Sequence, residues 1–271
     1  MPRSSSRLTH VLLTLGAIGM VAPFVWQVLT SLKTLPHATR VPPTLVPDGR
    51  WSNYSQVFEL LPFGEQFLNT LVMTAARGAG QVVFCSMAAY AFARLRFPGR
   101  TVLFGLFLSV LMVPPQLFII PQYEIISKLG WLNSLPALIV PGLFSAFGTF
   151  LLRQFFLGLP AELDEAARLD GANPLRIWWS VMMPLARPGL VALGILTTIW
   201  SWNDFFWPLV VNNDPEKMTL SAGLASLQGQ FMTDYPVLMA GSLLASLPVI
   251  AVFVVMQRQF VQGIAFTGTK G

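Results

Sequence analysis

Residues 165–188, EAARLDGANPLRIWWSVMMPLARP, place charged and turn-forming side chains between two long apolar stretches of the chain. Upstream, Pro160 suits the first turn of a helix, and the acidic side chains after it suit the positive end of the helix dipole. Gly171 can take the left-handed conformation that ends helices. Asn173 can then cap a second helix whose first position is Pro174. The stretch therefore predicts two short helices joined by a tight turn.

The rest of the chain has the composition of a membrane protein. Of 271 residues, 54% are hydrophobic and 11% are charged, and the mean hydropathy is +0.62. Apolar runs of eighteen or more residues recur, and each is long enough to cross a bilayer. So little charge leaves no room for a second, water-exposed domain. We expect six spans, at about 9–32, 67–92, 101–121, 135–152, 188–211 and 237–257.

The basic residues predict the orientation of these spans. An even number of spans puts both termini on one side, and eleven lysines and arginines fall on that side against five on the other. The positive-inside rule then places both termini in the cytoplasm. The first span follows Arg3 and Arg7 like a signal peptide, but its length and the lack of a cleavage site favour a retained anchor. The net charge of +5 reflects this topology and predicts no nucleic-acid partner.

The sequence predicts no catalytic residue and no metal site. Cys85 is the chain's single cysteine, and His10 and His37 lie near opposite ends of the first span with no carboxylate cluster beside them. The chain has no G-x-x-x-x-G-K-[ST] phosphate loop. We therefore expect no ATP hydrolysis by the chain itself and no cofactor bound to it.

Five polar or aromatic residues inside the predicted spans are candidates for a substrate pathway. Trp200, Asn203, Asp204 and Trp207 recur at helical spacing on one face of the fifth span, and they combine aromatic rings with polar groups as a sugar site requires. An aromatic belt at the membrane boundary and a polar helix contact are the alternatives. Arg77 is ionisable inside the second span, where it either snorkels to the interface or pairs with Asp204.

The stretch around residue 165 also carries a family resemblance. Glu165-Ala166-Ala167, Asp170-Gly171-Ala172 and the later Pro184 and Pro188 resemble the EAA loop of ABC importer permeases. Other segments along nearly the whole chain resemble the carbohydrate-uptake permeases of the MalG type, binding-protein-dependent transport system inner membrane components with a MetI-like fold. They are Ser31-Leu32-Lys33, Asn53-Tyr54, Asn69-Thr70-Leu71, residues 89–94 (AYAFAR), residues 97–100 (FPGR), Trp202-Asn203-Asp204 and residues 268–271 (GTKG).

The resemblance implies an all-α membrane protein with six transmembrane helices and a cytoplasmic coupling helix. Residues 1–65 would form an N-terminal helix and an extracytoplasmic segment, and residues 66–271 a five-helix core with a coupling loop at about 153–187. Such a permease pairs with a second homologous permease subunit, two copies of an ABC ATPase that bind ATP and Mg, and an extracytoplasmic solute-binding protein. It lies in a bacterial or archaeal plasma membrane, in contact with lipid. The residues implied in the ATPase contact are Glu165, Ala166, Ala167, Asp170, Gly171 and Ala172.

Several alternatives stay open at this point. An ordinary amphipathic loop on the membrane surface explains two short helices without an ATPase, and Glu165 or Asp170 can cap a helix without touching a partner. A secondary transporter would show paired internal repeats, and a membrane enzyme would show convergent His, Cys or carboxylate groups. The substrate is a sugar by resemblance, with amino sugars and glycerol phosphates as alternatives. The proline-rich segment from Lys33 to Glu65 is either ordered against a docked binding protein or a plain connector.

Overall fold

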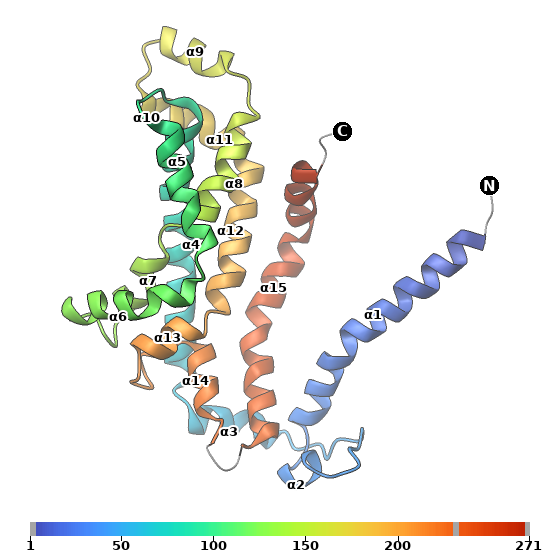
Figure 1. The fold of residues 1–271 in the computed structure, drawn as a ribbon. Coiled ribbons are helices and arrows are strands. Elements are labelled where there is room, and N and C mark those ends of the chain that lie inside the picture. Colours follow the sequence, from blue (N-terminus) through green and yellow to red (C-terminus); the bar gives the residue numbers. More distant parts are fainter. Residues whose placement is uncertain (1–3, 230–232, 269–271) are drawn as a thin grey trace. The chain divides into compact units, whose positions relative to one another are not determined.

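The computed structural model describes residues 4–229 and 233–268 and is helical apart from one isolated antiparallel bridge between Gln228 and Thr233. The chain divides into two compact units, which are described separately (Figure 1). Unit 1 comprises Met1–Gly64 and Gly223–Pro248, and unit 2 comprises Glu65–Ala222 and Val249–Gly271.

Unit 1 begins with the long helix α1, Ser4–Ser31, which holds Pro23 in its interior. The apolar side chains of its membrane-length stretch, Leu8–Ser31, are almost all exposed, so this surface is available to lipid or to a partner subunit. The unit also holds the short helices α2 (Leu35–Ala38) and α3 (Ser52–Leu60). Helices α14 (Leu220–Ser226) and α15 (Tyr235–Gly268) each cross between the two units in sequence.

The connector after α1 is ordered by its own hydrogen bonds. The buried side-chain amide of Asn53 donates to the carbonyl oxygens of Ser31 (2.7 Å) and Lys33 (2.8 Å). The carboxylate of Asp48 accepts a 2.7 Å bond from the backbone N–H of Thr34, and that bond holds the pKa of Asp48 below its ordinary value. The proline-rich segment therefore has a folded structure held by its own hydrogen bonds.

Unit 2 contains the remaining helices, and α9 and α10 lie at one end of it while α6 and α13 lie toward the other (Figure 1). A π-helical turn, Trp178–Met182, joins α10 to α11. The helices are α4 (Phe63–Arg94), α5 (Arg100–Ser109), α6 (Ile119–Lys128), α7 (Leu135–Ile139), α8 (Ala146–Leu157), α9 (Glu162–Leu169), α10 (Pro174–Ile177), α11 (Met183–Leu185), α12 (Arg187–Trp202) and α13 (Phe206–Val211).

Three helices of the described residues are long and apolar enough to cross a membrane, and three bent pairs raise the number of candidate spans to as many as six. The long helices are Leu8–Ser31, Phe63–Arg94 and Tyr235–Val255, which coincide with the first, second and sixth predicted spans. The bent pairs are Arg100–Met112 with Pro115–Lys128 (98°), Leu135–Gly142 with Ala146–Leu157 (40°), and Pro174–Leu185 with Arg187–Trp202 (81°). The expected all-helical membrane fold is confirmed, but three spans are broken.

Proline explains two departures from the predicted continuous spans. The predicted span 101–121 turns by 98° at the adjacent Pro114 and Pro115. The predicted continuous helix 188–211 is wrong, because α12 ends at Trp202 and α13 begins at Phe206. In an unbroken helix Pro208 would have to bond to the carbonyl of Asp204, but it has no N–H and its ring clashes with that carbonyl.

Helices α8 and α12 pack closely because glycine stands at their contact. A β-carbon built on Gly189 of α12 would lie 2.6 Å from the ring of Phe155 in α8. One built on Gly148 of α8 would lie 2.9 Å from the side chain of Leu193. The neighbouring core cluster draws buried side chains from α4, α8 and α12, including Cys85, which has no exposed surface.

We predict that Gly189→Ala lowers the free energy of unfolding by about 1–3 kcal/mol, because the added methyl group forces Phe155 and the two helices apart. Gly194→Ala on the same helix is the matched control, since its built β-carbon meets no atom within 4 Å. That control should leave stability unchanged or raise it by up to about 1 kcal/mol. Thermal unfolding in detergent, monitored by thiol labelling of buried Cys85, measures the stability of both variants. Equal melting points for Gly189→Ala and Gly194→Ala would contradict the close packing at Gly189.

Candidate functional site

The segment around α9 folds as the sequence predicts. Helix α9 ends at Leu169, and Gly171 takes a left-handed conformation with φ +80°. The side-chain oxygen of Asn173 then accepts a 2.9 Å hydrogen bond from the backbone N–H of Arg176, which caps α10 at its first residue, Pro174. The two short helices and the tight turn between them are confirmed.

The six residues expected to contact an ATPase divide by exposure. Glu165, Ala166, Asp170 and Gly171 are exposed, whereas Ala167 and Ala172 are half-buried against the core cluster. The exposed set also includes Leu169, which is 89% exposed. The sequence places Leu169 on the apolar surface near the turn, but not among the six residues expected to contact an ATPase. We call these five exposed residues the α9 surface: Glu165, Ala166, Leu169, Asp170 and Gly171.

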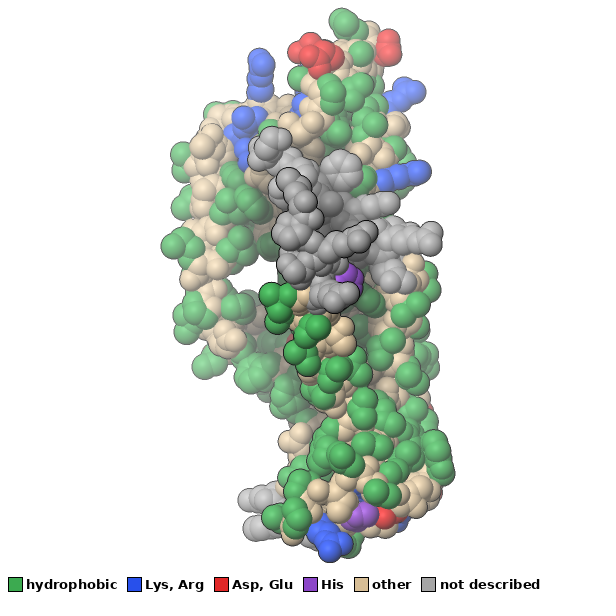
Figure 2. Space-filling model, turned by 90° about the vertical axis from the view of Figure 1, so that its right-hand side faces the viewer, with side chains coloured by type: hydrophobic (Ala, Val, Ile, Leu, Met, Phe, Trp, Pro, Cys, Tyr) green, Lys and Arg blue, Asp and Glu red, His purple; other side chains and the backbone are tan. Residues whose placement is uncertain are grey.

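Charged side chains surround the α9 surface. Figure 2 shows acidic and basic side chains together at the upper end of the view, where α9 lies. The exposed charged residues of α9, α10 and the turn between them are Glu162, Glu165, Arg168, Asp170 and Arg176. An apolar knob with a mixed-charge rim has the chemistry of a protein interface.

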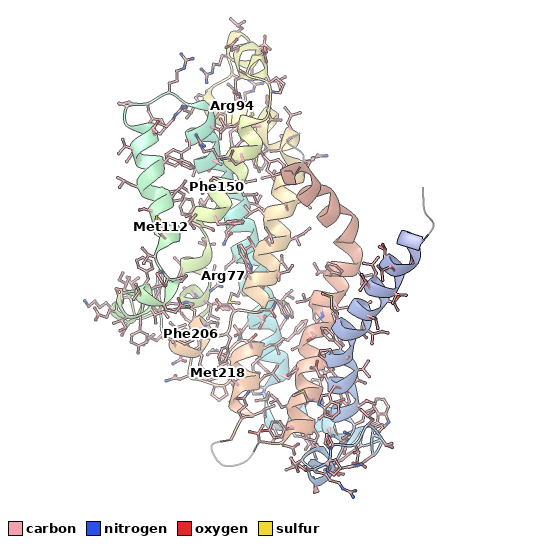
Figure 3. The ribbon with its side chains drawn as sticks, turned by 45° about the vertical axis from the view of Figure 1, so that its right-hand side comes forward. Arg77, Arg94, Met112, Phe150, Phe206 and Met218 are labelled. Carbon is pink, nitrogen blue, oxygen red and sulfur yellow. The ribbon has the colours of Figure 1, made fainter. Side chains whose placement is uncertain are left out.

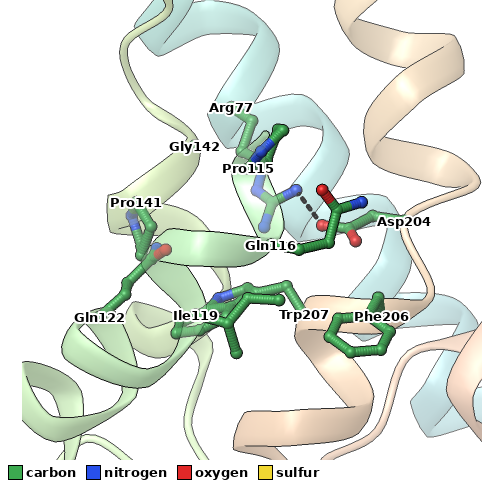
Figure 4. A pocket seen from close by; sticks show the side chains of 10 residues that line it. All are labelled: Arg77, Pro115, Gln116, Ile119, Gln122, Pro141, Gly142, Asp204, Phe206 and Trp207. Carbon is green, nitrogen blue, oxygen red and sulfur yellow. Dashed lines mark hydrogen bonds and ion pairs between the residues drawn. The ribbon is translucent and has the colours of Figure 1, made fainter. Parts of the chain in front are cut away.

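A cavity of about 470 Å³ lies within unit 2, at the breaks in the third, fourth and fifth predicted spans (Figure 4). Its walls combine an ion pair, two amides, a tryptophan and a phenylalanine. The lining residues are Arg77, Pro115, Gln116, Ile119, Gln122, Pro141, Gly142, Asp204, Phe206 and Trp207.

An ion pair crosses this cavity. Nη1 of Arg77 lies 2.7 Å from Oδ2 of Asp204, as the dashed line in Figure 4 marks, and the side chains are 8% and 22% exposed. Nε of Arg77 donates to the carbonyl oxygen of Leu138 at 2.8 Å. Gly142 makes room for the guanidinium, because a β-carbon there would lie 2.4 Å from Nε. The pairing alternative for Arg77 is therefore confirmed, and its charge is neutralised within the protein.

The four aromatic and polar residues predicted to share one face of the fifth span do not share it. The helix breaks between Trp202 and Phe206, so Asn203 and Asp204 lie in the break, and that part of the prediction is wrong. The indole N–H of Trp207 donates to the carbonyl of Ala137 at 2.9 Å and the ring lines the cavity.

The other two members of that set lie outside the cavity lining. Trp200 is 51% exposed and packs edge-to-face on Phe147, with ring centroids 5.3 Å apart. The side-chain amide of Asn203 donates to the carbonyl of Ile199 at 2.8 Å and so closes the end of α12. Only Arg77, Asp204 and Trp207 of the sequence candidates line the cavity.

The sequence analysis missed Gln116, Gln122 and Phe206, which complete the polar and aromatic lining. Gln116 follows the Pro114-Pro115 break and Gln122 lies on α6, so a cavity at these positions appears only once the helix turns by 98°. Figure 3 shows Phe206 beyond Arg77 on the side away from Arg94. Broken helices beside a polar cavity are the arrangement in which transporters hold their substrates.

Comparison with known proteins also points to a transport protein. Residues 81–265 match the family model described as "Binding-protein-dependent transport system inner membrane component". The chain is 36% identical over 265 residues to the sn-glycerol-3-phosphate transport system permease protein UgpE of Yersinia enterocolitica, with 94% of each chain covered. It is 34% identical over 279 residues to the arabinooligosaccharides transport system permease protein AraQ of Halalkalibacterium halodurans, with 100% of each chain covered.

A solved structure has the same fold. The chain is similar to a chain of the crystal structure of a bacterial ABC transporter involved in the import of the acidic polysaccharide alginate, with a TM-score of 0.83. The sequence identity is 27%, and the match covers 96% of this chain and 99% of the other.

We predict that Asp204→Asn lowers the free energy of unfolding by about 1–3 kcal/mol, because it leaves the guanidinium of Arg77 buried without its counter-charge. The double variant Arg77→Gln/Asp204→Asn should lose no more stability than the worse single variant, since it removes both charges. Chemical unfolding in detergent gives the three values. Fully additive losses would contradict a direct ion pair.

Proposed function

The chain belongs to the family of binding-protein-dependent transport system inner membrane components. On that premise we propose that the α9 surface binds an ATPase subunit and that the cavity is the pathway of a sugar. The chain is a multi-pass inner-membrane permease subunit of an ABC importer. It is not the catalytic subunit and binds no cofactor itself, because ATP is used by the ATPase partner.

The family implies an ATPase and a binding protein as partners. In our proposal the complete importer contains this chain, a second homologous permease subunit, two ATPase copies and one extracytoplasmic binding protein. Both termini then lie in the cytoplasm, in agreement with the eleven-to-five distribution of basic residues. That orientation puts α9 on the same side as the ATPase.

The α9 surface is the proposed ATPase contact. Leu169 and Ala166 supply a small apolar knob, and Glu165 and Asp170 supply carboxylates beside it. The half-buried Ala167 and Ala172 support this knob from beneath instead of touching the partner, because they pack on the core cluster. Gly171 sets the direction of the knob through its left-handed backbone.

The cavity around Arg77 and Asp204 is the proposed substrate pathway. Its two amides, its carboxylate and its aromatic rings can hydrogen-bond and stack with a carbohydrate. Among the described lining residues Arg77 is the one cation, and Asp204 already neutralises it. A phosphate group would need a free cation. We therefore assign an uncharged sugar, in line with the arabinooligosaccharide permease relative.

Glycerol 3-phosphate is the second candidate substrate. Its support is the 36% identity to a permease protein named for sn-glycerol-3-phosphate transport. Its phosphate would compete with the carboxylate of Asp204 for the positive charge of Arg77, whereas an uncharged sugar would not.

Substrate-stimulated ATP hydrolysis by the reconstituted importer tests the proposed function. The panel contains an arabino-oligosaccharide, an alginate oligosaccharide and glycerol 3-phosphate, each presented with the binding protein. Gly171→Pro should reduce stimulation and transport by at least about tenfold, since proline cannot adopt φ +80° and removes the N–H that donates to Arg168.

Gly49→Pro is the matched control, because Gly49 also has a positive φ, of +73°, and open space around it, but lies in the connector of unit 1. It should leave stimulation unchanged. A Gly171→Pro importer that assembles and responds like the wild type would contradict the role of α9. If only glycerol 3-phosphate stimulates ATP hydrolysis, the substrate is glycerol 3-phosphate and the assignment of an uncharged sugar is wrong.

A further inference from the structure

One side chain of helix α9 is deeply buried in unit 2. Asp164 is the buried residue among the eight residues of α9, and its side chain is 8% exposed. The neighbouring Glu165 and Ala166 are exposed, and Ala167 is half-buried against the core cluster. The deepest contact that a displacement of α9 would disturb is therefore the contact of Asp164.

Asp164 contacts Arg94, the last residue of α4. Nε of Arg94 lies 3.3 Å from Oδ2 of Asp164, and the arginine side chain is 9% exposed. Nη2 of the same guanidinium donates to the carbonyl oxygens of Phe156 (2.6 Å) and Leu159 (2.5 Å), at the end of α8 and in the turn that follows it. One side chain thus joins α4, the end of α8 and α9.

The charge of Asp164 depends on this arginine. Its second oxygen, Oδ1, is buried and has no hydrogen-bond donor among the described residues. Burial raises the pKa of Asp164, and the positive charge of Arg94 is the largest opposing influence. Without Arg94 the buried carboxylate would lose its largest stabilising charge, an unfavourable change. The contact is therefore an ion pair between two buried groups, in which Nε of Arg94 and Oδ1 of Asp164 make no hydrogen bond among the described residues.

Helix α4 leads from this contact to the cavity. Arg94 and Arg77 are seventeen residues apart on one continuous helix that holds no proline, and Figure 3 shows them at successive levels along it. At 1.5 Å per residue their α-carbons are about 25 Å apart along the axis. Sharp kinks occur mostly at proline or at a π-helical turn, and α4 contains neither between these two residues.

We propose that Arg94 is the positioning residue that carries movement of α9 into α4, and through α4 to the Arg77–Asp204 pair that crosses the cavity. The proposal rests on the proposed function, in which an ATPase moves α9. Arg94 touches neither ATPase nor substrate in this scheme. Loss of the Arg94–Asp164 contact leaves the α9 surface and the cavity intact, but movement of α9 then no longer moves α4.

The test compares Arg94→Gln with Arg94→Lys and Asp164→Asn in the complete importer, reconstituted in proteoliposomes with its ATPase and binding protein. Arg94→Gln should keep the ATPase bound and keep basal ATP hydrolysis, while sugar transported per ATP falls at least tenfold. Asp164→Asn should also lower the amount of sugar transported per ATP. Arg94→Lys keeps the charge but not the fork of three contacts, so its ratio should lie between.

The matched control is Arg96→Gln, which removes the same charge from an exposed side chain two residues further on. It should leave transport per ATP unchanged. A merely structural role for Arg94 would lower assembly, basal hydrolysis and transport together and leave their ratio unchanged, which would overturn the proposal. Failure of both Arg94→Gln and Asp164→Asn to assemble would also overturn it, since the pair would then hold the fold together.

The outcomes separate this proposal from the proposed function. If Gly171→Pro abolishes stimulation while Arg94→Gln transports normally per ATP, α9 is the ATPase contact and Arg94 is not its link. If Gly171→Pro and Arg94→Gln both behave like the wild type, the proposed role of α9 fails and the proposal about Arg94 fails with it.

Discussion

Two buried guanidinium groups on helix α4 are the constraint that organises unit 2. A buried charge is tolerated only when a counter-charge and hydrogen bonds replace its hydration. Arg77 meets this demand with Asp204 and the carbonyl of Leu138, and Arg94 meets it with Asp164 and two carbonyls at the end of α8. Each arginine thereby fixes a different broken or loop segment to the same continuous helix. The α9 segment and the cavity are both positioned by α4.

Two breaks in the other helices are favoured by proline, and they border the cavity. Proline removes a hydrogen bond and its ring clashes with the carbonyl four residues earlier, which favours the breaks observed at Pro114-Pro115 and ahead of Pro208. In a membrane the freed backbone groups need partners or a polar cavity. Here the breaks border a cavity of about 470 Å³ with Gln116, Gln122 and Asp204 in its wall. In the proposed function, these interrupted helices form the substrate pathway.

The α9 segment was predictable from sequence because its signals are local. The left-handed Gly171 and the cap at Asn173 each depend on a few neighbouring residues, and both were found as expected. The cavity was not, because its residues come from segments far apart in sequence. Hydropathy alone treated 188–211 as one helix and so placed Trp200 beside Trp207, whereas the break between Trp202 and Phe206 separates them. Gln122 has no local signal at all, since it lines the cavity only after α6 turns.

A pair of spin-label distances, measured with and without ATP in the complete importer, tests most directly whether α9 and α4 move together. In a Cys85→Ser background, labels at exposed Glu162 and Arg96 report α9 against the end of α4, and labels at exposed Ala75 and Ile120 report α4 against α6 beside the cavity. The account predicts that ATP changes the second distance and leaves the first unchanged. A first distance that changes while the second stays fixed would contradict it, because α9 would then move without α4.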